Sequence, residues 1–240
     1  MKVVDLENID STNSYAKSNI DTLEDKTLVF ARRQNSGRGR LNRSWVDLGE
    51  GNLFLSFVLK PADKYRKILP NLTQYLSVCL CKVLETYGLK TQIKWPNDVL
   101  INGKKIAGIL SETVMQGSIL KGLVLGIGVN LNAQKYDVEQ IPDRVVTALN
   151  IELNHNVDLD KFFNELTDEF FKGYDCFLEN GFAQIKQDYI QRNCFIGKEL
   201  NVQVFNSVEK GLAKSVNDNG ELVLLNKDNK EIVLTIGDIL

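Results

Sequence analysis

The residues best suited to chemistry gather in one short polar run, Gln34 to Trp45, which reads QNSGRGRLNRSW. Gly37 and Gly39 allow the backbone to turn sharply and to approach a ligand closely. The three arginines of the run offer forked donors for phosphate or carboxylate groups, and the indole of Trp45 offers a flat face for a purine ring. Taken alone, the run could be an anion-binding loop, an arm that binds nucleic acid, or a solvated connector between two strands.

A second candidate lies between Lys94 and Glu112, where the sequence reads KWPNDVLINGKKIAGILSE. Asn97 and Asp98 place two polar side chains at the start of a hairpin. Lys105 lies on the returning strand, and Gly108 keeps the surface beside it open. A carboxylate, an amide and an ammonium group can therefore converge here, although an ordinary hairpin with a lysine facing solvent also fits this stretch alone.

Two shorter motifs complete the set of candidate site residues. In GIGVN, Gly126 and Gly128 interrupt an apolar strand, where glycine marks close approach by a ligand or another backbone. Asn130 at its end could hold a phosphate or a metal-bound water. Near the N-terminus, the hydroxyls and amide of the STN motif, residues 11–13, can bind a small polar group or cap a helix, and capping is the commoner use.

Charge and composition exclude several functions. The 29 basic and 31 acidic residues give a net charge of −2, which argues against a protein that coats nucleic acid or an anionic membrane. The single histidine, His155, lies in a polar run typical of a surface loop, so a Ser-His-Asp or Cys-His mechanism lacks its general base. Four scattered cysteines are typical of buried apolar side chains in a reducing compartment. With no apolar leader and no membrane-length apolar run, we predict a cytoplasmic protein.

The pattern of elements predicts an α+β fold with a mixed, largely antiparallel sheet. Amphipathic helices are predicted at residues 70–88, with Pro70 in the first position, and at 159–180. Between them, residues 98–132 read as consecutive antiparallel strands, the first two joined by a tight turn at Asn102-Gly103. Short strands and turns after residue 191 predict a small β-barrel. We therefore divide the chain into a main unit, 1–191, and a C-terminal unit, 192–240.

Taken together, the motifs resemble those of the biotin–protein ligases, also called biotin–[acetyl-CoA-carboxylase] ligases. In chain order they are STN at 11–13, QxxGRGRxxRxW at 34–45, KWPND at 94–98, KxAGIL at 105–110 and GxGxN at 126–130. The GRGR and KWPND segments are highly specific as a pair. The resemblance covers essentially the whole chain, because the C-terminal unit is similar to the SH3-like domain of the family.

The resemblance implies a catalytic domain related to class II aminoacyl-tRNA synthetases and lipoate ligases. It implies that biotin and MgATP form biotinyl-5′-AMP, which is then attacked by the lysine of a biotin carboxyl carrier protein. Some relatives begin with a DNA-binding winged helix-turn-helix. Because the STN motif begins ten residues from the start of this sequence, we expect a form without that domain, and we expect no binding to nucleic acid or membrane. Relatives often dimerise through the catalytic sheet, so a homodimer is also possible.

The resemblance also implies site residues. The biotin-binding residues would be Ser11, Thr12, Asn13, Gln34, Gly37, Arg38, Gly39, Arg40, Lys105 and Gly108. The residues that contact ATP or the adenylate would be Arg40, Arg43, Trp45, Asn97, Lys105 and Asn130. The catalytic residues would be Lys105, Arg40 and Asp98. The ligands of the metal ion remain unassigned.

Two alternatives stay open on the sequence alone. A lipoate or octanoate ligase shares the fold and the adenylate chemistry but has a more apolar acyl pocket, and the STN and GRGR motifs favour biotin over it. A non-enzymatic nucleic-acid-binding module could use the arginine loop, but the nearly neutral charge of the chain speaks against it.

Overall fold

A seven-stranded sheet forms the centre of the main unit. A computed structural model describes residues 2–142 and 145–240, except for the side chain of Asn42. Across the sheet the strands are β1 (Val3–Ile9), β2 (Thr27–Gln34), β3 (Leu53–Leu59), β7 (Ile119–Val129), β6 (Lys104–Gln116), β5 (Asp98–Ile101) and β4 (Thr91–Lys94). The β1–β2 pair is parallel and the other five neighbouring pairs are antiparallel. The mixed, largely antiparallel sheet of the prediction is confirmed.

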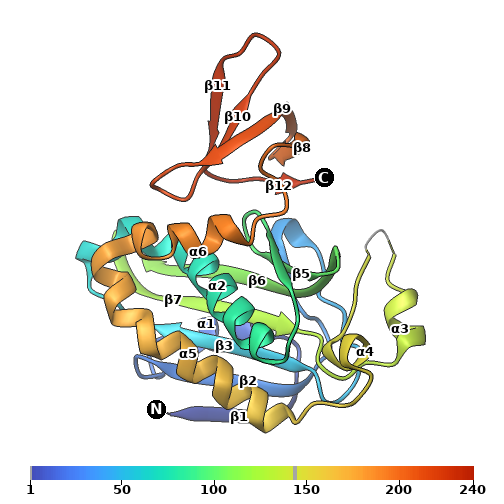
Figure 1. The fold of residues 1–240 in the computed structure, drawn as a ribbon. Coiled ribbons are helices and arrows are strands. Elements are labelled where there is room, and N and C mark those ends of the chain that lie inside the picture. The colour runs from blue at the N-terminus through green and yellow to red at the C-terminus, as the bar shows by residue number, and fades with distance from the viewer. Residues whose placement is uncertain (1, 143–144) are drawn as a thin grey trace.

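The two faces of the sheet carry different helices (Figure 1). One face is covered by α2 (Leu72–Thr86), α5 (Leu159–Asn180) and α6 (Lys186–Gln191), and α1 (Thr12–Ser18) packs on the opposite face. The short helices α3 (Lys135–Glu139) and α4 (Leu149–Leu153) lie beyond one end of the strands. Within residues 2–142 and 145–240 there are also three 3-10 helices, η1 (Arg40–Asn42), η2 (Asp63–Asn71) and η3 (Gly181–Gln184).

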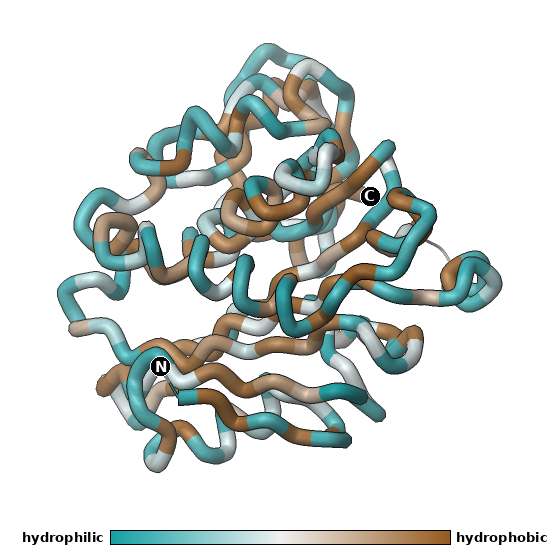
Figure 2. Tube along the Cα trace, turned by 60° about the horizontal axis from the view of Figure 1, so that its bottom comes forward, coloured by the Kyte–Doolittle hydropathy of each residue, from teal (hydrophilic) through white to brown (hydrophobic). Residues whose placement is uncertain are grey.

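The strand β3 is buried on both faces, which explains why its sequence is apolar except for Ser56. Side chains alternate along a strand. Phe57 packs against Phe170 of α5 with ring centroids 4.3 Å apart, whereas the next residue, Val58, packs with Ala16 and Ile20 of the α1 segment. The hydropathy of the trace follows this arrangement, with hydrophobic residues concentrated in the strands of the sheet (Figure 2). Apolar packing therefore holds helices to both faces of the central sheet.

The predicted hairpin turn and the predicted end of α5 are confirmed, but the predicted start of α2 is wrong. The Asn102-Gly103 turn has positive φ at both residues, and α5 ends before Gly181, which has a φ of 60°. By contrast, α2 begins at Leu72, and Pro70 lies in the preceding helix η2. Proline has a fixed φ and no amide hydrogen, so it is compatible with the short turn that leads into α2.

The prediction that all four cysteines are buried is also wrong. Cys79 and Cys81 are buried in α2, but Cys194 is only partly buried and Cys176 is exposed. Cys176 lies on the polar face of the amphipathic helix α5, which turns away from the sheet. His155 is exposed in a loop, as the sequence predicted. None of the helices in the described part of the chain combines the length and apolar character needed to span a bilayer.

The C-terminal unit is an open sheet of five strands, not the closed barrel that the sequence predicted. Its strands lie in the order β11 (Glu231–Leu234), β10 (Leu222–Leu225), β9 (Ser207–Val216), β8 (Glu199–Val204) and β12 (Asp238–Ile239). The neighbouring pairs are antiparallel. The last strand has only two residues, both paired with β8, and the side chain of Asp238 contacts arginines of the main unit. This edge of the sheet is therefore used for contact between the units instead of for closure.

A turn of the C-terminal unit anchors it to α2. The carbonyl oxygen of Gly220 accepts hydrogen bonds from Gln74 Nε2 at 2.7 Å and from Trp95 Nε1 at 3.1 Å. The segment that connects the two units also pairs with the main sheet, because the amide of Ile93 in β4 donates to the carbonyl of Arg192. The first residues after 191 thus still pair with the main sheet, and the division of the chain at residue 191 stays a prediction.

Candidate active site

A cavity of about 880 Å³ opens on the face of the sheet opposite α2 and α5. Strand alternation places Ser56 of β3, Gly126 and Gly128 of β7, and Gly108 of β6 on this face, where Ser56 pairs with Gly126 and Gly128 pairs with Gly108. The three glycines leave the middle of the face without side chains. The hollow therefore follows from the sequence of these strands, and its volume is typical of a small-molecule site.

The indole of Trp45 lies directly against this glycine floor. A Cβ atom added at Gly128 would lie 2.5 Å from Trp45 Cε2, and one added at Gly108 would lie 2.9 Å from Trp45 Cζ3. Lys105 Nζ is 5.6 Å from the centroid of the indole. Trp45 Nε1 is buried and, within the described residues, has no hydrogen-bond acceptor. The ring and its donor thus form one wall of the cavity.

One end of the cavity is lined mainly by polar side chains that carry no charge. Ser11 caps α1 by accepting from the amide of Ser14, and Thr12 donates its amide to Gln34 Oε1 at 2.8 Å. Ser56, which the sequence analysis did not single out, lies 2.8 Å from Thr12 Oγ1 and donates to Asn13 Oδ1 at 2.6 Å. A lone serine in the apolar run LFLSFVL was the signal that could have found it. These groups can bind a small head group that has both donors and acceptors.

Glu112 fixes the orientation of this polar end. Asn13 donates its amide to Glu112 Oε2 at 3.1 Å, which leaves Asn13 Oδ1 to accept from Ser56. The same carboxylate pairs with Lys17 at 2.6 Å and with Arg38 at 3.1 Å. Burial acts to raise the pKa of Glu112, but the hydrogen bonds from Lys17 and Asn13 and the nearby charges outweigh it, so its pKa lies below the ordinary 4.5. Glu112 therefore ties the arginine loop to α1 as an ionised group.

We expect Glu112→Gln to lower the free energy of unfolding at neutral pH by about 1–3 kcal/mol, because charge-assisted hydrogen bonds are lost. A pKa that is lower in the folded state means that ionised Glu112 stabilises the fold above the unfolded value, and that this contribution disappears as the pH falls through the lowered pKa. The gap between wild type and variant should therefore close below pH 4.5. Denaturant unfolding of wild type and variant, at neutral pH and below pH 4.5, measures this difference in the free energy of unfolding.

Glu24→Gln is the matched control, because the pair of Glu24 with Lys2 is exposed on both sides. Such pairs contribute little to stability. A Glu112→Gln variant as stable as the Glu24→Gln control at neutral pH would contradict the role given to Glu112.

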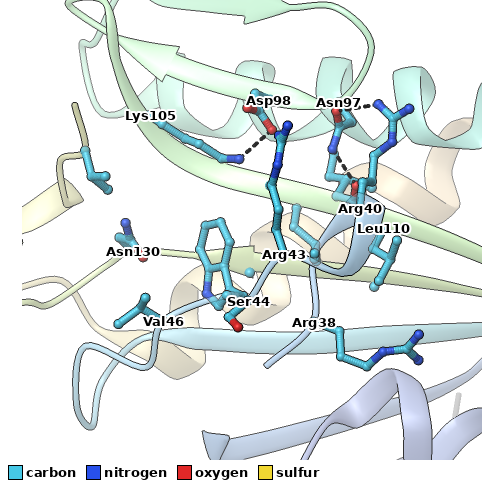
Figure 3. A pocket seen from close by; sticks show the side chains of 18 of the residues that line it. Arg38, Arg40, Arg43, Ser44, Val46, Asn97, Asp98, Lys105, Leu110 and Asn130 are labelled. Carbon is cyan, nitrogen blue, oxygen red and sulfur yellow. Dashed lines mark hydrogen bonds and ion pairs between the residues drawn. The ribbon is translucent and has the colours of Figure 1, made fainter. Parts of the chain in front are cut away.

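The other end of the cavity is cationic, and Figure 3 shows Lys105 beside Asp98 and Arg40 beside Asn97. Lys105 Nζ lies 2.6 Å from Asp98 Oδ1, and Arg40 Nη1 lies 3.1 Å from Asn97 Oδ1. Arg40 and Arg43 both reach the carboxylate of Asp238, at 3.0 and 2.9 Å. This end can bind the anionic part of a ligand whose head group lies at the polar end.

The structure brings together all but one of the residues predicted for the site. Those that line the cavity are Ser11, Thr12, Asn13, Gln34, Arg38, Gly39, Arg40, Arg43, Trp45, Asn97, Asp98, Lys105, Gly108 and Asn130. Gly37 is not among the lining residues. A Cβ atom at Gly37 would lie 2.4 Å from the carbonyl oxygen of Trp45, so close packing inside the loop accounts for this glycine.

Asn130 has a structural contact that the sequence did not indicate. Its amide donates to the carbonyl of Thr147 at 3.0 Å and so fastens the segment after β7 to the end of that strand. Asp238 was missed altogether, because nothing in the C-terminal strands predicted a contact with the arginine loop. Among the described residues, no group of three or more His, Cys, Asp or Glu side chains gathers in a form that could hold a metal ion.

Comparison with known proteins identifies the family. The model of the biotin/lipoate A/B protein ligase family matches residues 6–130, which is more than half of the chain. The chain belongs to this family. A biotin–[acetyl-CoA-carboxylase] ligase of Paracoccus denitrificans is 30% identical over 232 residues, which cover 93% of this chain and 94% of that protein.

Two further relatives extend the comparison. The bifunctional ligase/repressor BirA of Bacillus subtilis is 32% identical over 199 residues, or 82% of this chain, but these span only 61% of the length of BirA. Among solved structures, the biotin protein ligase of Aquifex aeolicus in complex with biotin and ATP superposes with a TM-score of 0.83 at 26% identity. That match covers 100% of this chain and 97% of the other. The fold is thus that of the biotin protein ligases.

Substitutions at two glycines of β7 should affect the two ends of the cavity separately. A Cβ atom at Gly126 would lie 2.0 Å from Asn13 Oδ1, whereas one at Gly128 would meet Trp45. We expect Gly126→Ala to weaken binding of a ligand at the polar end of the cavity by about tenfold or more, because Asn13 must move, and Gly128→Ala to weaken mainly binding at the end beside Trp45. Each variant serves as the control for the other in steady-state kinetics. Equal effects of both variants at both ends of the cavity would contradict this division of the site.

Proposed function

We propose that this chain is a biotin–[acetyl-CoA-carboxylase] ligase, which joins biotin to the acceptor lysine of a biotin carboxyl carrier protein at the expense of ATP. The observation that supports this most directly is the division of one cavity into a neutral polar end and a cationic end. Biotin has a polar ureido ring at one end and a carboxylate at the other. The named activity of the Paracoccus denitrificans relative is the same.

In the first step, a carboxylate oxygen of biotin attacks the α-phosphorus of ATP, the bond to the β-phosphate oxygen breaks, and pyrophosphate leaves. Lys105 is assigned to the junction of carboxylate and phosphate, where two anions are pressed together. Arg40 and Arg43 are assigned to the phosphates and Trp45 to the adenine. The step needs positioned cations and no protein nucleophile.

In the second step, the lysine amine of the carrier attacks the acyl carbon of biotinyl-5′-AMP, and AMP leaves with its electron pair. Asn97, Asp98 and Asn130 line the part of the cavity that we assign to the phosphates and the incoming amine. Asp98 Oδ1 lies 2.6 Å from Lys105 Nζ, so the same carboxylate keeps the ammonium group in place for the first step.

We infer that the nucleotide binds together with Mg²⁺. This ion prefers oxygen ligands and is usually held by one or two carboxylates and the substrate phosphates. Asp98 offers such a carboxylate in the cavity lining, which fits this requirement. When bound, the ion would neutralise charge on the phosphates.

The polar end of the cavity favours biotin over lipoate or octanoate. Thr12, Asn13, Gln34 and Ser56 present buried donors and acceptors there. The ureido ring of biotin can exchange hydrogen bonds with these groups, whereas a fatty acyl chain offers them neither a donor nor an acceptor, and a site built for hydrogen bonding rejects such a ligand strongly. Pyrophosphate exchange into ATP tests the choice, because it measures only the first step. We expect exchange with biotin and none with lipoate, and the reverse result would replace the proposal with a lipoate ligase.

Three further proposals concern nucleic acid, a homodimer and the cellular compartment. The arginines of the loop pair with Glu112 and Asp238, which leaves less free charge for nucleic acid and supports a role without it. We propose that a homodimer, if it forms, uses an edge of the main sheet such as β1, where strand pairing is open. The four free cysteines support a reducing compartment such as the cytoplasm.

A further inference from the structure

We infer that Asp238 of the C-terminal unit occupies the place of a nucleotide phosphate between Arg40 and Arg43, and that ATP must displace it. The inference rests on the proposed function, since it assigns these two arginines to the phosphates of ATP. It gives the C-terminal sheet a direct part in nucleotide binding. Asp238 is thus a positioning residue that acts through the arginine loop.

The geometry of the contact is that of an anion site already filled. Asp238 Oδ1 lies 3.0 Å from Arg40 Nη1, and Asp238 Oδ2 lies 2.9 Å from Arg43 Nη1. The carboxylate thus forms ion pairs with two guanidinium groups, but among the described residues its buried Oδ2 atom accepts no hydrogen bond. Only 10% of its side chain is exposed, and Arg40 is 18% exposed. The pair is therefore shielded from solvent, where such contacts are stronger than on an open surface.

The backbone around Asp238 holds the carboxylate in place. Asp238 pairs with Gln203 of β8, and the turn at Gly220 fastens the same sheet to the main unit through Gln74 of α2 and through Trp95. The carboxylate is therefore mounted on a paired strand, whereas Arg40 and Arg43 lie in and just after the three-residue helix η1, within the arginine loop. When a ligand with several negative charges enters, the loop is the part that can move.

The negative charge of Asp238 should weaken the binding of ATP. A phosphate placed between the same two arginines would lie close to the negative charge of Asp238 and be repelled by it. Binding of ATP must therefore break at least one of the two ion pairs. By linkage, a protein without this charge binds ATP more tightly, and a protein with ATP bound holds the loop to the C-terminal sheet more weakly.

Asp238→Asn tests this with little change in size. The KM for ATP in biotin-dependent pyrophosphate exchange should fall about fivefold or more, while the KM for biotin stays unchanged. Asp218→Asn is the matched control, because Asp218 lies in the same unit and pairs with Lys186 away from the arginines. Asp238→Glu, which keeps the charge, should behave like the wild type. A KM for ATP that is unchanged or raised in Asp238→Asn overturns the inference.

A second measurement needs no substrate and no activity. Without ligand, trypsin should cut after Arg40 and Arg43 faster in Asp238→Asn than in wild type or Asp218→Asn, because the loop has lost its anchor. Equal cutting rates in the three proteins would overturn the anchoring role of Asp238. If the wild type shows no biotin-dependent exchange, the proposed function fails, and this digestion still tests the contact by itself.

Discussion

Replacing Lys105 by alanine is expected to slow the formation of biotinyl-5′-AMP by about two to three orders of magnitude. Lys105 lies in the cavity with 14% of its side chain exposed, beside Asp98 and the ring of Trp45. In the proposed first step its charge offsets the repulsion between carboxylate and phosphate, which is greatest as the new bond forms. The loss should therefore fall on kcat more than on either KM, as measured by single-turnover formation of the adenylate.

The neighbouring lysine provides a matched control. Lys104 points to the other side of β6, where it lies 3.4 Å from Glu152 Oε1, and it is not among the residues that line the cavity. Lys104→Ala should keep nearly full activity, although it removes the same charge one residue away. Adenylate formation by Lys105→Ala at the rate of the Lys104→Ala control would show that the role given to Lys105 is wrong.

Arg40→Gly is expected to release biotinyl-5′-AMP into solution and to label bystander proteins. The adenylate is a mixed anhydride that any free amine can attack, so the enzyme must hold it until the carrier protein docks. Arg40 reaches into the cavity, where it contacts Asn97 and Asp238. Loss of its contacts with the phosphate would weaken retention by about 2–4 kcal/mol, on the order of a hundredfold faster release.

The test uses serum albumin as the bystander. Wild type and variant are incubated with biotin, ATP and albumin, and the albumin is probed with streptavidin. Arg66→Gly is a suitable control, because Arg66 is exposed on η2 and pairs with Asp63 at the surface. Albumin that stays unlabelled with Arg40→Gly, although the variant still makes adenylate, would contradict the retaining role of Arg40.

Local rules of the sequence determined most of the elements and the motifs that they carry. The Asn102-Gly103 pair predicts its hairpin because both residues tolerate positive φ, and the apolar spacing of residues 159–180 predicts α5. The polar motifs were also visible, since glycines and arginines are rarely so dense without a use. In each of these cases the interaction that decides the outcome lies within a few residues along the chain.

Other features could be decided only by the tertiary structure. The pairing of β3, β7 and β6 sets Ser56 beside Gly126 and Gly128 beside Gly108, and one residue of slip would turn these side chains to the other face. The start of α2, the exposure of one cysteine and the open C-terminal sheet likewise depend on how neighbouring elements pack.

The contacts of the two carboxylates that pair with the arginines were also decided only by the tertiary structure. Glu112 reaches Asn13, Lys17 and Arg38 from a distant strand, and Asp238 reaches Arg40 and Arg43 from the last strand of the chain. No local pattern marks either residue, because an acidic side chain on a strand is ordinarily solvated. A charge becomes part of a site only when the folded sheet carries it into a partly desolvated space beside an opposite charge, and that placement is a property of the whole fold.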